Sequence, residues 1–151
     1  MIRKAEESDV EIIAEYNCKM AMETEDLKLD KEIVLKGVSH ALNDSSKAEY
    51  YLYEIDGMVV GQLMITKEWS DWRDGDFWWI QSVYVDNNYR RKGIFRALYN
   101  HVEKLVQKDP FACGIRLYVE KNNERAQHTY KEMGMEETHY LLYEVENINR
   151  I

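Results

Sequence analysis

Residues 77–85 form an almost uninterrupted apolar run that passes directly into a basic loop and then into an amphipathic pattern. A run this short and this apolar predicts a strand that is covered on both faces, at the centre of a sheet. Beyond the loop, helical spacing gathers apolar side chains on one face: Ile94, Ala97, Leu98, Val102, Leu105 and Val106. The chain must therefore fold with helices over both faces of a sheet.

The basic loop and the start of the predicted helix form a candidate anion site. The first turn of a helix leaves backbone N–H groups without intrahelical partners, and the helix dipole is positive there. Four cations add to these donors: Arg90, Arg91, Lys92 and Arg96. A phosphorylated ligand suits this combination, although a charged turn without a ligand is the simpler alternative. The spacing fits neither a Walker loop nor the three glycines of a dinucleotide fingerprint.

Composition limits the classes of partner. The chain has 151 residues, enough for one domain with a substantial core and too few for two ordinary ones. Its net charge of −8 argues against nucleic acid as a partner. A local basic patch on an acidic protein suits a small polyanionic ligand better than a polymer.

The sequence gives no indication of a membrane segment, a secretory leader or a metal site. No apolar run approaches the roughly 20 residues that a membrane helix needs, so we expect a cytoplasmic protein without a membrane partner. The four histidines and two cysteines lack ligand spacing, so no metal is expected. Cys18 and Cys113 are expected to be small buried side chains.

The predicted order of elements is strand, two helices, three strands, helix, strand, helix, strand. Strands are expected at 2–4, 50–55, 58–67, 77–85, 115–119 and 140–145, with a hairpin turn at Asp56-Gly57 and a loop at 68–76. Three of the helices are expected to begin at Ser8 or Asp9, at Asp30 and at Asn123. Hairpin-linked strands followed by strand–helix alternation predict an α/β (α+β) fold with a mixed central sheet.

Two motifs resemble those of the GNAT superfamily of N-acetyltransferases. The segment Arg90-Arg91-Lys92-Gly93-Ile94-Phe95 is similar to the acetyl-coenzyme A signature Gln/Arg-x-x-Gly-x-Gly/Ala, but Phe95 replaces its final small residue. The segment 122–135 resembles the later motif Asn-x-x-Ala-x-x-x-Tyr-x-x-x-Gly-Phe, with Met135 at the final position. The resemblance covers essentially the whole chain. It implies one domain over residues 1–151, with six to seven strands and about four helices.

The resemblance also implies the cofactor contacts. In this family the basic loop binds the pyrophosphate of acetyl-CoA, and the preceding strand, often at a bulge, aligns the pantetheine arm through its backbone. Carried over to this sequence, the cofactor-binding residues are Val83, Tyr84, Val85, Arg90, Arg91, Lys92, Gly93, Ile94, Phe95, Arg96 and Asn123. Asn123 is equally well explained as a helix N-cap, and the two roles are compatible.

Tyr130 is the candidate catalytic residue. From its position on the buried face of a predicted helix alone, it would be a core side chain. The matching tyrosine of the family commonly protonates the departing coenzyme A thiolate, and a phenol of pKa about 10 can donate to a thiolate whose conjugate acid lies near 8.5.

Acceptor residues are harder to predict. Tryptophans interleaved with aspartates suit a cationic amine, so Trp72 and Asp76 are candidate acceptor contacts, together with Gln81 on the central strand. Relatives often carry a carboxylate base on that strand, where this chain has Trp79 and Gln81. Glu54, Glu68 and Asp76 are alternative relays, and no base is assigned.

The expected function is acetyl transfer from acetyl-CoA directly to a primary amine. A small molecule is the preferred acceptor because the chain is acidic, and a protein lysine or N-terminus is the alternative. A non-catalytic domain that senses acetyl-CoA is the competing class. Homodimers are common among relatives, so a homodimer is a further option.

Overall fold

The computed structural model describes residues 1–150, which fall into two compact units that meet between Leu117 and Tyr118. The first unit contains strands β1 (Ile2–Lys4), β2 (Glu49–Ile55), β3 (Met58–Ser70), β4 (Gly75–Val85) and β5 (Ala112–Arg116). Its helices are α1 (Val10–Glu25), α2 (Lys31–Asn43) and α3 (Ile94–Lys108), with 3₁₀ turns at Glu7–Asp9 and Asn87–Tyr89. Among the helices of residues 1–150, none is long and apolar enough to cross a membrane.

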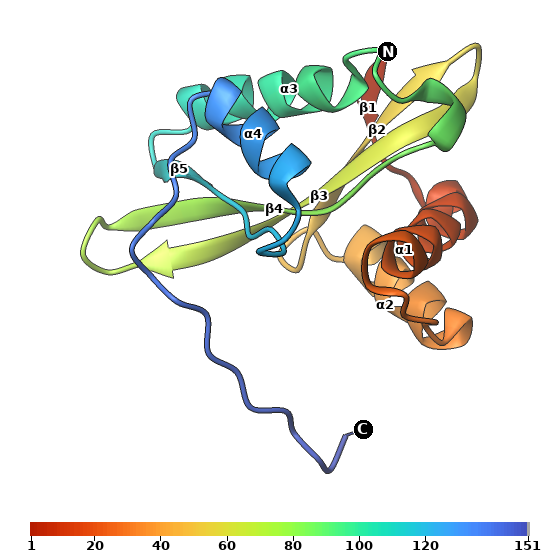
Figure 1. The fold of residues 1–151 in the computed structure, drawn as a ribbon, viewed down its shortest axis with the longest axis horizontal. Helices are drawn as coiled ribbons and strands as arrows, with labels where there is room; N and C mark the ends of the chain where they lie inside the picture. The colour runs from red at the N-terminus through yellow and green to blue at the C-terminus, as the bar shows by residue number, and fades with distance from the viewer. Residues whose placement is uncertain (151) are drawn as a thin grey trace. The chain divides into compact units, whose positions relative to one another are not determined.

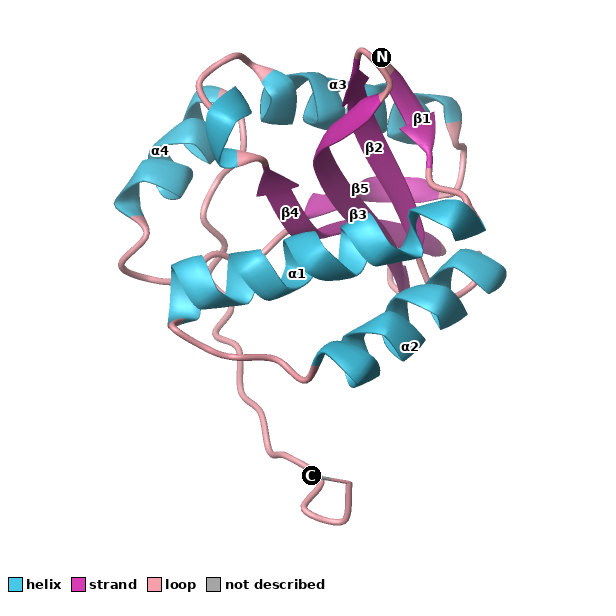
Figure 2. Ribbon diagram, turned by 90° about the vertical axis from the view of Figure 1, so that its right-hand side faces the viewer, coloured by secondary structure: helices cyan, strands magenta, loops and turns pink. Residues whose placement is uncertain are grey.

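The five strands form one sheet in the order β1-β2-β3-β4-β5. Neighbouring strands are antiparallel except β4 and β5, which are parallel and connected through α3. Helices α1 and α2 lie on one face of this sheet and α3 lies on the other (Figure 1). The view turned by 90° shows α1 and α2 side by side over that face (Figure 2).

Helices α1 and α2 cover the sheet through apolar stripes at helical spacing. Ile13 and Ala14 of α1 and Val38 and Ala41 of α2 are buried in one cluster with Tyr50 and Leu52 of β2. Burial of such side chains is worth about 25 cal/mol per Å² of apolar surface, so this cluster contributes strongly to holding the helix pair on the sheet. The α/β class and the mixed sheet with helices on both faces are confirmed.

Two local predictions are also confirmed. Asp30 caps α2, because its side chain accepts hydrogen bonds from the amides of Glu32 and Ile33. Asp56 and Gly57 form the turn between β2 and β3 with φ values of 50° and 77°. Positive φ at both central residues is the geometry that makes Asp-Gly a strong hairpin signal.

The predicted strand count was wrong. We expected six to seven strands, and the structure has five in residues 1–150, because the predicted strand at 140–145 is extended chain without a partner strand. The large apolar side chains of this segment are exposed rather than buried: Tyr140, Leu141, Leu142, Tyr143 and Val145. An apolar segment becomes a strand only where another strand is present to pair with it.

Element boundaries differ from the predicted ones for reasons of tertiary packing. Helix α1 continues to Glu25, and it ends at Asp26 in the left-handed conformation. Strands β3 and β4 pair with each other as far as Ser70 and Gly75, so both strands are longer than predicted. The predicted loop at 68–76 is correspondingly shorter. Strand β5 begins at Ala112, three residues before the predicted start.

The second unit contains α4 (Glu124–Glu132). The Asn123 side chain accepts a hydrogen bond from the Ala126 amide at 3.1 Å, so the predicted N-cap is confirmed. Gly134 follows the helix with φ of 91°, the left-handed geometry that glycine commonly adopts at the end of a helix.

We predict that Asp9→Asn destabilises the protein at neutral pH but not in acid. Asp9 is buried and accepts two hydrogen bonds from Arg3, at 2.8 and 2.9 Å, and these bonds lower the pKa of its carboxyl. A lowered folded-state pKa stabilises the protein above the unfolded-state pKa of about 4, and this stabilisation disappears as the pH falls through the folded-state value. Removing the charge should cost about 2 kcal/mol of unfolding free energy at pH 7.

Urea unfolding of the wild type and the variant at pH 7 and at pH 2.5 measures this difference. Glu7→Gln, at an exposed neighbouring carboxylate, serves as the control and should change stability little at either pH. An Asp9→Asn deficit that is the same at both pH values would contradict the prediction.

Candidate active site

Strand β4 contains a bulge next to its carboxyl end. Its register with β3 shifts between Gln62 and Met64, where Gln62 pairs with Tyr84 and Met64 pairs with Gln81. Leu63 therefore faces two residues of β4, Ser82 and Val83, and Ser82 has a φ of 51°. A left-handed serine at a bulge turns the strand and redirects the backbone groups that follow. The family resemblance led us to expect a bulge in this region, and the register shift lies there.

Beyond the middle of β4, one edge of the strand has no partner strand in residues 1–150. The pairing with β5 ends at Trp79 and Arg116, so residues 80–85 pair only with β3. The Asp86 amide donates to Val60 of β3 at 2.8 Å. Because successive amides of a strand point to opposite edges, the N–H groups of Val83 and Val85 point to the open edge.

Helix α3 follows the basic loop after β4 and begins with an uncapped first turn. Gly93 is its N-cap residue, has a φ of 79° and makes no side-chain cap hydrogen bond, since glycine has no side chain. A Cβ at Gly93 would meet no atom within 4 Å, so the space beside the N-cap residue is open. This combination of open space and uncapped amides fits an anion such as a diphosphate.

Arg90, the first residue of the signature, is held by other parts of the chain. Its Nε donates to the Val85 carbonyl at 2.9 Å, and its Nη2 lies 2.6 Å from a carboxylate oxygen of Glu23. The same glutamate accepts a hydrogen bond from the Tyr84 hydroxyl at 3.0 Å. The hydrogen bond to Glu23 raises the pKa of Arg90 above its ordinary value. Arg90 and Tyr84 thereby connect the loop to the end of α1.

The other cations of the signature lie on the surface near the start of α3. Arg91, Lys92 and Arg96 are exposed, and Arg91 has a φ of 64°. The ring of half-buried Phe95 lies 6.4 Å from that of Tyr99, one turn further along α3. The substitution of a small residue by Phe95 keeps the backbone amide and adds a ring that packs along the helix.

Gly61 of β3 determines how close the first turn of α3 comes to the sheet. A Cβ at this position would lie 2.7 Å from Cγ2 of Ile94 and 3.6 Å from Cδ1 of Leu98. Both of these side chains are buried. The absence of a side chain at Gly61 therefore lets α3 begin close to β3.

The predicted acceptor residues are spread along β4 rather than gathered at the bulge. Gln81 is next to Ser82, and its Nε2 donates to Thr66 at 2.6 Å. Asp76 pairs with Trp69 at the other end of the strand, about 20 Å from Ser82 at 3.3 Å per residue. Trp72 lies in the turn beyond Asp76 and is 85% exposed. Only Gln81 lies close to the bulge.

Two of the three candidate proton relays are ion-paired. Glu54 lies 2.7 Å from Arg3, next to the N-terminal strand. Glu68 accepts hydrogen bonds from the indole of Trp79 at 3.1 Å and from Arg116 at 2.9 Å. These pairings give Glu54 and Glu68 a structural role that does not require them to act as proton relays.

Tyr130 lies on α4 in the second unit, where it is half-buried. Burial raises the pKa of its phenol above the ordinary value of about 10. The phenol is therefore protonated at neutral pH and retains a proton that it can donate.

Sequence reasoning missed the polar contacts under the bulge. Gln62 is fully buried, and its Nε2 donates to the Ser82 carbonyl at 3.1 Å and to Asn17 of α1 at 2.8 Å. The available signal was a single amide in an otherwise apolar strand segment at 59–64. Asn17 lies on the apolar face of its helix, where a polar residue needs an internal partner.

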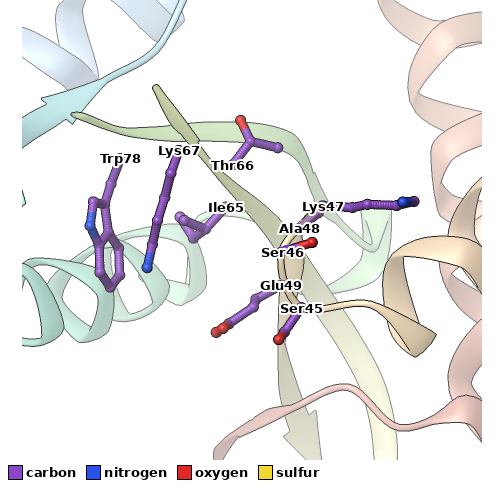
Figure 3. Close-up of a pocket in the computed structure, with 9 residues that line it drawn as sticks. All are labelled: Ser45, Ser46, Lys47, Ala48, Glu49, Ile65, Thr66, Lys67 and Trp78. Carbon is purple, nitrogen blue, oxygen red and sulfur yellow. The ribbon is translucent and has the colours of Figure 1, made fainter. Parts of the chain in front are cut away.

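A pocket of about 270 Å³ lies elsewhere on the sheet, beside the connection from α2 to β2 (Figure 3). Its lining includes Glu49, Thr66, Lys67 and Trp78, and the Lys67 ammonium lies 4.6 Å from the centre of the Trp78 ring. None of the predicted site residues lines it.

The uncapped helix start, the cations around it and the open edge of β4 suit a ligand that joins a diphosphate to an extended arm. A sequence model of the Acetyltransferase (GNAT) family matches residues 12–135. The chain belongs to this family and is an acetyl-CoA-dependent N-acetyltransferase. No curated protein matches the chain closely enough to count as a relative.

Solved structures support the assignment. A possible acetyltransferase from Clostridium difficile 630 is 48% identical, with a TM-score of 0.93 over 98% of this chain and 97% of that one. A predicted acetyltransferase with acetyl-CoA from Clostridium acetobutylicum is 14% identical, with a TM-score of 0.78 over 100% and 97%. A ribosomal-protein-alanine N-acetyltransferase from Brucella melitensis is 18% identical, with a TM-score of 0.78 over 97% and 98%. The last two similarities show the fold alone.

We predict that Gly61→Ala destabilises the protein and weakens coenzyme A binding. The added methyl group would overlap Ile94, so the first turn of α3 must move or the core must absorb the extra volume. Overpacking of this kind costs about 1–3 kcal/mol of unfolding free energy.

Gly37→Ala is a matched control, because a Cβ at this position in α2 meets nothing within 4 Å. Glycine is a poor residue for a helix interior, so this control should raise stability by about 0.5–1 kcal/mol. Denaturant unfolding and calorimetric titration with coenzyme A measure both variants. Equal effects of the two substitutions would show that Gly61 has no special role in packing.

Proposed function

We propose that this acetyltransferase transfers the acetyl group of acetyl-CoA directly to the primary amine of a small molecule, within a single domain that spans residues 1–151. The amides of the first turn of α3, with Arg91, Lys92 and Arg96, bind the diphosphate. The N–H groups of Val83 and Val85 bind the pantetheine arm and polarise the thioester carbonyl. The observation that carries the proposal is the open edge of β4, toward which these two amides point.

Direct transfer follows from the residues of the site. A covalent route would need a nucleophile such as an activated cysteine, and both cysteines lie outside the site residues named above. In the direct reaction the amine nitrogen forms a bond to the acetyl carbon and the bond from that carbon to sulfur breaks. The amine releases one proton to solvent, and the sulfur receives one.

Tyr130 is the proposed donor of the proton to sulfur. Burial keeps its phenol protonated at neutral pH, and an acid of this kind is worth about 10²- to 10⁴-fold in rate. Asn123 caps the same helix, and we propose that it also contacts the cofactor. Proton donation at the leaving sulfur supports turnover without requiring a change in cofactor affinity.

The chemistry of the acceptor follows from charge. The chain carries a net charge of −8, which favours a cationic small amine over an acidic partner. Gln81 lies close enough to the bulge to contact the reacting amine. Trp72 and Asp76 can contact the same acceptor only if it extends about 20 Å along β4.

We predict that Tyr130→Phe lowers kcat by at least 100-fold and leaves the affinity for acetyl-CoA unchanged, because only the proton donor is lost. Thiol release from acetyl-CoA, measured with a panel of short amines, polyamines, aminoglycosides, and lysine and N-terminal peptides, tests the proposal. Tyr143→Phe, at an exposed tyrosine in the same unit, is the matched control and should keep full activity.

An unchanged kcat in Tyr130→Phe would remove the proposed role of this residue. Turnover with peptides but with no small amine would show that the acceptor is a protein amine and not the proposed small molecule. Tight binding of acetyl-CoA without turnover of any amine would favour a sensor.

A further inference from the structure

The bulge of β4 places Ser82 in a conformation that needs support. Its φ of 51° lies in the left-handed region, which costs energy for any residue with a Cβ. Such a conformation persists only where surrounding contacts determine it. The contacts around Ser82 therefore decide where the following amides point.

Gln62 supplies the contact to the Ser82 backbone. Its side chain is fully buried between the sheet and α1, and its Nε2 donates to the Ser82 carbonyl at 3.1 Å and to Asn17 Oδ1 at 2.8 Å. The Asn17 amide in turn donates to the Tyr50 hydroxyl at 3.4 Å. Burial raises the pKa of Tyr50, and hydrogen bonds with Asn17 and Ser82 partly offset this increase. Three polar side chains, those of Gln62, Asn17 and Tyr50, thus lie behind the bulge.

The Gln62 amide is not arranged for stability alone. Its Oε1 is buried and has no hydrogen-bond partner in residues 1–150. An unpaired buried acceptor is unfavourable, and an apolar side chain of the same shape would avoid it. What the glutamine provides instead is a donor aimed at one particular carbonyl.

The geometry of the peptide group connects this contact to the proposed cofactor site. The carbonyl of Ser82 and the N–H of Val83 belong to one planar, trans peptide group, in which they point in opposite directions. A donor that holds the carbonyl on the side of α1 therefore fixes the N–H on the other side. By holding the Ser82 carbonyl, Gln62 thus sets the direction of the Val83 N–H.

We propose that Gln62, oriented by Asn17, is a positioning residue for the acetyl-transfer step, because it fixes the Ser82–Val83 peptide so that the Val83 amide faces the thioester. This inference rests on the proposed role of the Val83 amide. According to this inference, the buried residues Asn17 of α1 and Gln62 of β3 affect kcat rather than binding of the diphosphate.

The test is Gln62→Met, which keeps the length of the side chain and removes both donors. We expect kcat to fall at least tenfold and the affinity for acetyl-CoA to weaken severalfold. The affinity for ADP, which has the diphosphate but no pantetheine arm, should stay within twofold of wild type. In the free protein, the amide resonance of Val83 should shift in an NMR spectrum.

Ile13→Val is the matched control, because Ile13 lies one turn before Asn17 on the buried face of α1 and contacts no proposed ligand group. It should destabilise the protein by about 0.5–1.5 kcal/mol and keep kcat. Ser82→Gly combined with Gln62→Met should recover part of the lost kcat, because glycine adopts a positive φ without strain.

If Gln62→Met does not fold, Asn17→Ala makes the same test, since Gln62 then loses the partner that orients it. Equal kcat values for the glutamine or asparagine variant and for Ile13→Val would overturn the proposal. Parallel losses of ADP and acetyl-CoA affinity would also overturn it, by indicating a general structural defect. A wild-type protein that binds neither ligand would instead refute the proposed function.

Discussion

The open edge of β4 is the constraint on which the rest of the site depends. A strand in the middle of a sheet normally has both edges occupied, and its amides are then unavailable to a ligand. Here β5 pairs with β4 only as far as Trp79, and the bulge at Ser82 turns the remainder of the strand. Two main-chain amides thereby become available within the rigid frame of a sheet, where their directions are fixed before a ligand arrives.

Packing on both faces of the sheet supports the open edge of β4 and the loop that follows it. On one face, Gly61 allows the start of α3 to approach β3, so that the uncapped amides of the helix lie near the end of β4. On the other face, α1 contributes Asn17 under the bulge and Glu23 beside the loop. Preorganised main-chain donors of this kind are effective because they need no reorganisation during the reaction.

Sequence reasoning succeeded where a local pattern carried the information. The apolar run at 77–85, the Asp30 cap and the Asp56-Gly57 turn each have a short-range physical cause, and the structure confirms them. The segment 90–95 indicated the family by its resemblance to the acetyl-CoA signature, and in the structure its glycine is a left-handed N-cap. These features depend only on neighbours within a few residues.

The remaining features depend on contacts distant in sequence. Tertiary packing determines where β5 stops pairing with β4, at Trp79. It also determines the positive φ of Ser82 and the contact of Gln62 with α1. The periodicity of the sequence does not encode any of these. The predicted strand at 140–145 failed for the same reason, because an apolar segment forms a strand only where another strand pairs with it. Likewise, proximity in sequence did not bring Trp72 and Asp76 to the bulge, since an extended strand separates residues rapidly.

An NMR titration of ¹⁵N-labelled protein with coenzyme A tests the central claim most directly, because it reports on individual amides. The account predicts that the largest shifts occur at Val83 and Val85 and at the amides of Gly93 to Arg96, with smaller changes along β1 and β2. Shifts confined to side-chain groups of the surface cations, or centred on the pocket around Trp78, would show that the open edge of β4 is not where the cofactor binds.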